Sequence, residues 1–317
     1  MTRILITRAL PDSVVARAES LFDVELRDRT TPMSRAEMRA SLALYDGVLP
    51  TLGDAYDARV FDGFEHPRCR VLANFGVGYN HIDVEAARAA GVTVTNTPGA
   101  VTDATADIAM TLILMTCRRA GEGDRLVRSG TWEGWHPTQM LGTHVTGRKL
   151  GIAGFGRIGE AIARRCHFGF GMEVLFHNRS AKTPDFPARQ VDSLAELATE
   201  SDILVCALPG GAETRHMIDA DILAAMRPEA HFVNISRGDV VDQTALIGVL
   251  EAGLIRGAGL DVYEDEPEVP ERLRRLENAV LLPHLGTAAL EVREAMGHVA
   301  LDNLAAFFAG ETPPDAV

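Results

Sequence analysis

Short apolar runs rich in β-branched residues alternate along the chain with longer stretches of mixed apolar and polar residues. The first series of apolar runs lies at residues 4–7, 24–26, 47–49, 71–74 and 92–95. Between them are stretches with the spacing of amphipathic helices, at residues 11–21, 34–45 and 83–90. Strands that alternate with helices predict βαβ units and a parallel sheet with helices on both faces.

A second series of apolar runs follows at residues 149–153, 173–177, 203–207, 231–235, 257–261 and 280–282. Six strands are the number of a complete dinucleotide-binding sheet. Residues 102–119 separate the two series and contain neither Gly nor Pro, which predicts a buried helix that links the domains or packs against another subunit. Residues 288–308 again show helical spacing, whereas residues 130–147 have few periodic signals and predict a long surface connection.

Length and composition limit the class of protein. With 317 residues the chain suits two domains, and its 46% hydrophobic and 24% charged residues are ordinary for a globular protein. A formal net charge of −13 argues against nucleic-acid binding. No run of about 18 apolar residues and no signal-peptide pattern occurs, so we expect no membrane association. The four cysteines are scattered singly, which favours a reduced cytoplasmic protein without disulfides or a metal site.

A glycine-rich turn follows the first strand of the second series. Its residues, in order, are Gly154, Phe155, Gly156, Arg157, Ile158 and Gly159. The GxGxxG spacing alone is weak evidence, but a strand precedes it, and a helix and a second strand follow, as in dinucleotide-binding folds. The first glycine permits the tight turn, the second lets the backbone approach a pyrophosphate, and the third allows close helix–strand packing. The alternative is a glycine-rich turn without a ligand.

The end of the second strand of this series selects between the two nicotinamide cofactors. An acidic residue there binds the ribose 2′-hydroxyl and repels a 2′-phosphate. This chain instead has Asn178, Arg179 and Ser180, and an arginine can pair with a phosphate. The sequence therefore predicts a preference for NADP(H), with NAD(H) as the alternative. The alternative is that Arg179 is a solvent-exposed surface charge that does not contact the cofactor, in which case it gives no preference for NADP(H).

Three charged residues follow three successive strands of the second series: Arg237, Glu266 and His284. Carboxyl ends of parallel strands share one edge of a sheet, so these side chains are expected to converge. An arginine can hold a substrate carboxylate and polarise a ketone. A histidine can supply a proton near neutral pH, and a neighbouring glutamate favours the protonated imidazole. Taken singly, each residue could be a surface charge or a structural group; their joint placement indicates reduction of a keto acid.

Several sequence blocks together resemble the D-2-hydroxyacid dehydrogenase family over nearly the full length of the chain. The blocks are NFGVGYNHID at 74–83, NTPG at 96–99, GFGRIG at 154–159, NISRGDVV at 234–241, residues 257–267, and LPHLGTA at 282–288. Within the family the chain is most similar to the glyoxylate/hydroxypyruvate reductases. NISRGDVV, the tryptophan-containing connection and HNRS at 177–180 carry this narrower resemblance.

The resemblance implies roles for individual residues. Arg237, Glu266 and His284 match the family's substrate-binding arginine, histidine-tuning acid and acid/base. The backbone of Val77 and Gly78 matches the groups that hold the substrate carboxylate, and Leu52 is expected to line the substrate pocket. Trp135 resembles a tryptophan that reaches into the partner subunit's active site, although packing at an interface would explain it equally well. Besides the glycine-rich turn and residues 178–180, the expected cofactor-binding residues are Thr105, Leu208, Pro209, Thr214, Ile235, Ser236, Asp261 and Gly286.

The resemblance also implies the architecture and the activity. A Rossmann cofactor domain, residues 100–287, is inserted into a flavodoxin-like substrate domain formed by residues 1–99 and 288–317. The expected protein is a homodimeric, NADPH-dependent reductase of small 2-keto acids such as glyoxylate or hydroxypyruvate, forming D-2-hydroxy acids.

Three alternatives share the fold. A phosphite dehydrogenase would keep the same three charged residues. A formate dehydrogenase would resemble this chain with Gln in place of Glu266. A nucleotide-sensing corepressor scaffold would keep the three residues but have only vestigial activity.

Overall fold

The alternating pattern folds into two parallel sheets. The computed structural model describes residues 1–317 and divides into two units, Met1–Val101 with Thr287–Val317, and Thr102–Gly286. The first boundary therefore lies after residue 101 rather than 99, and the second before residue 287 rather than 288. None of the helices has the length and apolar character needed to cross a membrane.

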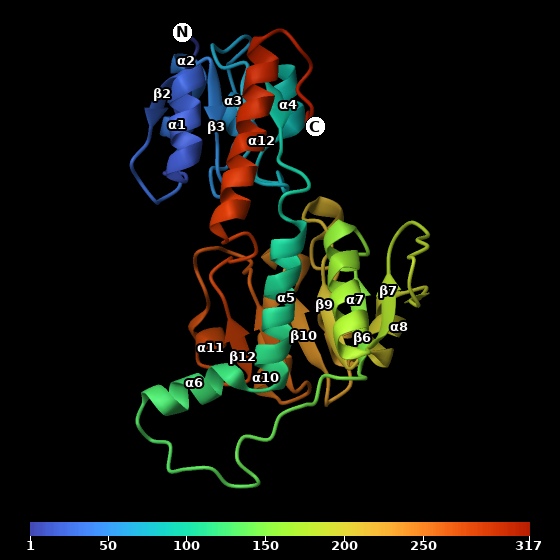
Figure 1. The fold of residues 1–317 in the computed structure, drawn as a ribbon. Helices are drawn as coiled ribbons and strands as arrows, with labels where there is room; N and C mark the ends of the chain where they lie inside the picture. The colour runs from blue at the N-terminus through green and yellow to red at the C-terminus, as the bar shows by residue number, and fades with distance from the viewer. The chain divides into compact units, whose positions relative to one another are not determined.

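The first unit is built on a five-stranded sheet with the order β2-β1-β3-β4-β5. Its strands are β1 (Arg3–Ile6), β2 (Asp23–Leu26), β3 (Gly47–Leu49), β4 (Val71–Ala73) and β5 (Thr93–Thr95). Its helices are α1 (Asp12–Leu21), α2 (Arg35–Leu44), α3 (Ala58–Phe61), α4 (Val84–Ala89) and α12 (Leu290–Phe308). All strand pairs are parallel, and the order is that of the flavodoxin-like fold. Helix α12 returns to this unit at the end of the chain and packs against α1 (Figure 1).

The second unit has a seven-stranded parallel sheet with the order β12-β11-β10-β9-β6-β7-β8. Its strands are β6 (Lys149–Ala153), β7 (Glu173–His177), β8 (Arg189–Gln190), β9 (Ile203–Cys206), β10 (His231–Asn234), β11 (Gly257–Leu260) and β12 (Ala279–Leu281). The order reverses between β6 and β9, as in the doubly wound dinucleotide fold, where ligands bind at such a point. The predicted α/β class with two parallel sheets is thus confirmed, and β8 is an additional short edge strand.

Helices cover both faces of the larger sheet. The helices of this unit are α5 (Thr102–Cys117), α6 (Ala120–Arg128), α7 (Arg157–Phe170), α8 (Leu194–Glu200), α9 (Ala220–Ala225), α10 (Gln243–Glu251) and α11 (Glu271–Arg274), of which α6 buries no residue. Helices α5 and α7 pack together on one face, where Ile113 and Ile162 enter the core (Figure 1). Leu197, Leu223 and Leu246, from α8, α9 and α10, enter a second core cluster.

Two features near α5 refine the expectation from sequence. The predicted helix ends at Cys117, and a separate helix, α6, which the apolar pattern did not predict, follows it. Residues 129–148 then form the expected long connection, with turns but no helix or strand, and Figure 1 shows this segment looping out beyond α6.

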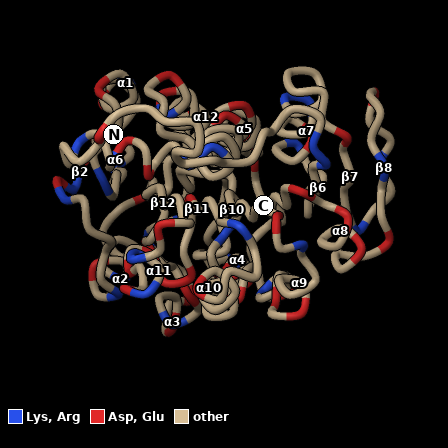
Figure 2. Tube along the Cα trace, turned by 90° about the horizontal axis from the view of Figure 1, so that it is seen from below, with Lys and Arg blue, Asp and Glu red and all other residues tan.

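Charged side chains of both signs are interspersed along the trace (Figure 2). Arg165 on α7 illustrates how they pair, because its guanidinium contacts Asp103 and Asp107 on α5, each at 2.9 Å. Such pairs fasten neighbouring helices at the surface and contribute little individually to stability.

Candidate active site

The glycine-rich turn joins β6 to α7 and forms an open cradle. Gly154 has φ +94°, and a Cβ there would lie 2.7 Å from the carbonyl oxygen of Ala207. A Cβ on Gly159 would lie 2.2 Å from the Gly154 carbonyl oxygen, so the helix packs directly on the turn. A Cβ on Gly156 would meet nothing within 4 Å, and no side chain caps the first turn of α7. Backbone N–H groups at this helix end are therefore available to a pyrophosphate, which fits a dinucleotide.

A polar cluster follows β7 at the place expected for the adenosine ribose. The Asn178 amide is held on both sides: its Oδ1 accepts from the Phe155 N–H at 3.1 Å, and its Nδ2 donates to Ser180. The Arg179 side chain is 94% exposed and lies 3.5 Å from the Glu213 carboxylate. No acidic residue occupies the end of β7 itself: the neutral Asn178 directly follows the strand, and the exposed Arg179 comes next.

The loop after β9 carries three more of the residues that are expected to bind the cofactor. Leu208 and Thr214 are half-buried, and Pro209 is exposed. The Thr214 hydroxyl donates to the Pro209 carbonyl at 2.7 Å, which closes the loop on itself. This loop and the glycine-rich turn are adjacent because β9 pairs with β6.

Asp261 organises the expected nicotinamide end of the cradle. Its carboxylate is 1% exposed and accepts from the N–H groups of Leu285 at 2.6 Å and Gly286 at 2.8 Å. Burial raises the pKa of Asp261, although these two hydrogen bonds and the nearby His284 oppose the shift. A Cβ on Gly286 would lie 3.5 Å from the Thr105 hydroxyl, so these three expected residues are neighbours.

The three charged residues after β10, β11 and β12 are brought to the same edge of the sheet. His284 and Glu266 are hydrogen-bonded, with Nδ1 of the histidine 2.8 Å from Oε2 of the glutamate. The second carboxylate oxygen accepts from the Tyr263 N–H at 3.1 Å, which fixes the carboxylate plane. With Nδ1 held by Glu266, Nε2 is the ring nitrogen left to act on a substrate. His284 has φ +55°, a backbone conformation that is uncommon outside glycine and often marks functional sites.

Arg237 extends this charged group. Its guanidinium donates to the Ser236 carbonyl at 2.8 Å, while the Ser236 N–H donates to the Asn234 side chain and the preceding Ile235 is buried. Burial lowers the pKa of Arg237, and the charge of Glu266 works in the opposite direction. Burial also disfavours ionised Glu266, but the hydrogen bond and charge of His284, together with the Tyr263 N–H and the charge of Arg237, outweigh it and hold the Glu266 pKa below its ordinary value. The carboxylate is consequently charged at neutral pH.

Close backbone packing holds the Arg237 and Glu266 loops together. A Cβ on Gly238 would lie only 1.8 Å from the carbonyl carbon of Tyr263, so any larger residue would force the loops apart. The Tyr263 hydroxyl also donates to the Leu282 carbonyl at 2.9 Å, which ties in the segment leading to His284. Gly238 and Tyr263 are supporting residues that the sequence patterns did not reveal.

The expected carboxylate-binding turn lies in the first unit, directly after β4. Asn74 is fully buried, and its amide donates to the carbonyls of Gly76 and Gly78 at 2.9 and 3.1 Å. Asn96 donates to the Val77 carbonyl at 2.8 Å. With their carbonyls engaged, Val77 and Gly78 form a rigid turn. Leu52 lies in another loop of this unit, where its carbonyl accepts from Arg8 at 2.6 Å.

A cavity of about 340 Å³ flanks this hydrogen-bonded pair, with His284 and Glu266 in its wall. The rest of its lining is mainly apolar and includes Val269, Leu281 and Pro283. Trp135 does not reach this place in its own chain. It is 79% exposed on the connection that leads into the amino end of β6, away from the carboxyl edge.

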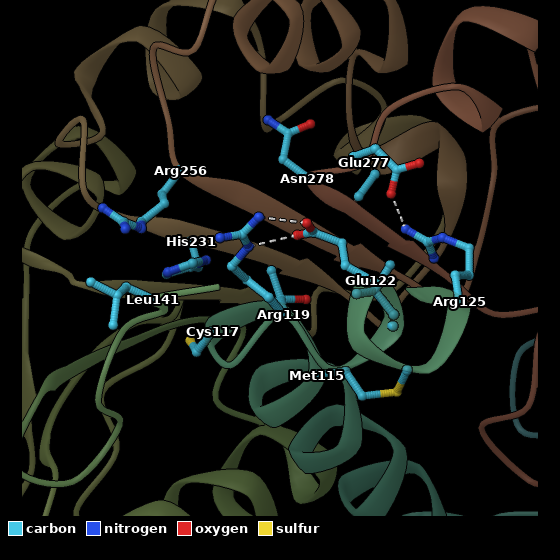
Figure 3. Close-up of a pocket in the computed structure, with 14 residues that line it drawn as sticks. Met115, Cys117, Arg119, Glu122, Arg125, Leu141, His231, Arg256, Glu277 and Asn278 are labelled. Atoms are coloured by element: carbon cyan, nitrogen blue, oxygen red, sulfur yellow. Dashed lines mark hydrogen bonds and ion pairs between the residues drawn. The ribbon is translucent and has the colours of Figure 1, made fainter. Parts of the chain in front are cut away.

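A second cavity, of about 300 Å³, opens at the opposite edge of the same sheet (Figure 3). It is lined by His231 at the start of β10, by Arg256 just before β11, and by residues of α5 and α6. Its arginines are already paired; Arg119, for example, lies 2.7 Å from Glu122. This cavity is therefore separate from the Arg237–Glu266–His284 site.

Comparison with known proteins agrees with this architecture. The family model of the D-isomer specific 2-hydroxyacid dehydrogenase NAD-binding domain matches residues 110–286. The glyoxylate reductases of Thermococcus onnurineus and Thermococcus kodakarensis are each 44% identical to the chain, covering 99% of it and 95% and 96% of their own lengths. The crystal structure of an NADPH-dependent glyoxylate/hydroxypyruvate reductase from Sinorhizobium meliloti, in complex with NADP and malonate, is 35% identical. Its TM-score is 0.89, over 100% of this chain and 96% of that one.

Fold, dinucleotide cradle and these likenesses define a nicotinamide-dependent oxidoreductase of the doubly wound α/β class. More narrowly, the chain belongs to the D-isomer specific 2-hydroxyacid dehydrogenase family.

Proposed function

We propose that this enzyme reduces small 2-keto acids of the glyoxylate and hydroxypyruvate type to D-2-hydroxy acids, with NADPH preferred over NADH. The observation that carries the proposal is the 2.8 Å pair of His284 and Glu266, beside Arg237, at the carboxyl edge of a sheet with a dinucleotide cradle. The names of the glyoxylate reductases at 44% identity support the choice of substrate.

The proposed mechanism assigns one task to each charged residue. The reduced nicotinamide, when bound, supplies a hydride to the keto carbon. Arg237 holds the substrate carboxylate and polarises the ketone, and its charge is permanent at neutral pH. His284 donates the Nε2 proton to the developing alkoxide, and Glu266 stabilises the imidazolium from which that proton comes. In the first unit, the backbone N–H groups of Val77 and Gly78 are proposed to bind a substrate carboxylate, as the resemblance to the family implies.

Cofactor preference is proposed to depend on Asn178, Arg179 and Ser180. A neutral Asn at the end of β7 does not repel a 2′-phosphate, and the exposed Arg179 can turn from Glu213 to pair with it. An acidic residue at this position would favour NADH instead.

A panel of 2-keto acids assayed with NADPH and NADH in parallel tests this proposal. We expect kcat/KM to be highest for glyoxylate or hydroxypyruvate, and higher with NADPH than with NADH. Turnover of bulkier 2-keto acids alone would contradict the substrate assignment, and equal or better use of NADH would contradict the cofactor assignment.

The assembly is proposed to be a homodimer in which Trp135 of the partner subunit covers the apolar cavity beside His284. Large apolar side chains are exposed on α5, on α6 and on the connection before β6: Leu114, Val127, Trp132, Trp135 and Leu141. Protein interfaces are a frequent location of exposed large apolar side chains. The mainly apolar lining of the 340 Å³ cavity suits an aromatic side chain.

Mixed dimers test this arrangement, with the mass of the assembly measured by light scattering. Trp135→Ala and His284→Ala subunits are each expected to form weakly active homodimers. If Trp135 serves the partner's site, a mixed dimer of the two regenerates one intact site and regains activity. If Trp135 serves its own site, or none, mixing restores nothing.

A further inference from the structure

Glu264, in the loop after β11, contacts the loop after β9 and the start of α10. Its carboxylate is only 18% exposed, and Oε1 accepts from His216 Nε2 at 2.8 Å and from Arg215 Nη2 at 2.9 Å. Its backbone N–H donates to the side chain of Gln243 at 3.3 Å. One carboxylate oxygen therefore joins the loop after β9, which carries His216, to the loop after β11, which carries Glu266.

The same segment of the β9 loop also contacts the loop after β10. The His216 N–H donates to the Asp239 carbonyl at 2.9 Å, and Asp239 lies two residues beyond Arg237. His216 has φ +51°, a conformation that residues other than glycine rarely adopt, so surrounding contacts must hold it. Because Gly238 packs directly on the Tyr263–Glu264 backbone, the three loops form one interlocked unit.

Each of the three loops carries a different part of the proposed site. The β9 loop contains Leu208, Pro209 and Thr214, expected on the adenosine side of the cofactor. The other two loops carry Arg237 and Glu266. Glu264 lies between these parts and touches none of the reacting groups in any contact described above. It is thus placed to act through its neighbours rather than on the substrate.

We propose that Glu264 is a positioning residue which, through His216 and Arg215, holds the cofactor-binding loop in register with Arg237 and Glu266. This inference rests on the proposed function, because the roles of those two residues and of the β9 loop belong to it. Binding of the cofactor to the β9 loop and alignment of Arg237 and Glu266 are then coupled through the Glu264 carboxylate, in addition to the backbone contacts between the loops.

The test compares Glu264→Ala and Glu264→Gln with the matched variant Asp265→Ala in the full-length enzyme. Asp265 is the adjacent carboxylate of the same loop and is exposed. Loss of hydrogen bonds to a charged group predicts that Glu264→Ala lowers kcat roughly tenfold and weakens NADPH binding several-fold. Glu264→Gln keeps an acceptor oxygen and should recover most of both losses, while Asp265→Ala stays within about twofold of the wild type.

A purely structural role would act differently. It would lower the melting temperature and the fraction of active enzyme, but leave the NADPH Kd of the folded enzyme unchanged. NADPH Kd, measured by fluorescence titration, therefore separates the two roles. An unchanged Kd with normal kcat per active site in Glu264→Ala would overturn the proposal, as would equal losses in Glu264→Ala and Glu264→Gln.

A second variant tests the pathway through His216. Asn tolerates the left-handed backbone, so His216→Asn removes the ring contact without forcing the loop to refold. The double variant His216→Asn/Glu264→Ala should lose little more than Glu264→Ala alone, because both remove the same contact. Fully additive losses would contradict the coupling. A wild-type enzyme that binds NADPH but reduces no 2-keto acid would instead refute the proposed function, and the Kd comparison would still test Glu264.

Discussion

Replacing Glu266 with Gln removes the negative charge beside His284 and leaves a side chain of nearly the same size. The two side chains are only 29% and 31% exposed, and their 2.8 Å contact is a charge-assisted hydrogen bond when the imidazole is protonated. Such bonds contribute about 1.5–3 kcal/mol, which corresponds to roughly 10- to 100-fold in rate if the protonated imidazole is needed in the transition state. Glutamine also has one acceptor oxygen where glutamate has two, so it cannot serve both the Tyr263 N–H and His284.

We therefore expect kcat for keto-acid reduction at neutral pH to fall roughly 10- to 100-fold in Glu266→Gln. The loss in kcat should shrink as the pH is lowered, because the higher proton concentration then favours the protonated imidazole that the carboxylate stabilises in the wild type. The assay is the steady-state rate of NADPH oxidation as a function of pH, with Asp265→Asn as the control for charge in the same loop. A Glu266→Gln enzyme with wild-type kcat across the whole neutral range would refute the assigned role.

Three further predictions address cofactor choice, packing and stability. Asn178→Asp combined with Arg179→Ser should reverse the ratio of kcat/KM between NADPH and NADH, and an unmoved ratio would refute the cofactor argument. Gly238→Ala should lower stability by about 3 kcal/mol in urea denaturation because its Cβ would overlap the next loop, whereas Gly248→Ala, with open space around its Cβ, should not. Burial and nearby Arg256 lower the pKa of His231 from 6.5 to about 4. The unfolded chain therefore binds a proton first as the pH falls, and up to about 3 kcal/mol of stability should be lost between those values. The variant His231→Gln should not show this part of the loss, and identical pH profiles of the urea midpoint would contradict it.

Strands with clear apolar runs were predictable because burial on both faces of a parallel sheet demands them. Helix α6 was not, since its sequence AGEGDRLVR contains two glycines and none of its residues is buried. Strand β8 has only two residues at the sheet edge, too few to leave an alternating pattern. Helices and strands that bury much apolar surface can thus be predicted from the sequence, whereas those that bury little cannot.

The site shows a similar division. Arg237, Glu266 and His284 could be named because each follows a strand, and the carboxyl ends of parallel strands meet. The supporting contacts could not be predicted in this way. Gly238 matters because another backbone approaches it closely, and His216 because its backbone is left-handed. Neither property has a periodic signature in sequence, and both become visible only once the loops are placed side by side.

The central claim is that His284 delivers the proton when a 2-keto acid is reduced. The most direct measurement is kcat/KM for glyoxylate with NADPH in His284→Ala beside the wild type, together with the NADPH Kd of each. We expect a loss of roughly 100-fold or more in kcat/KM while the Kd changes little, since general acid catalysis contributes about 10²–10⁴-fold. Near-normal turnover by His284→Ala would contradict it.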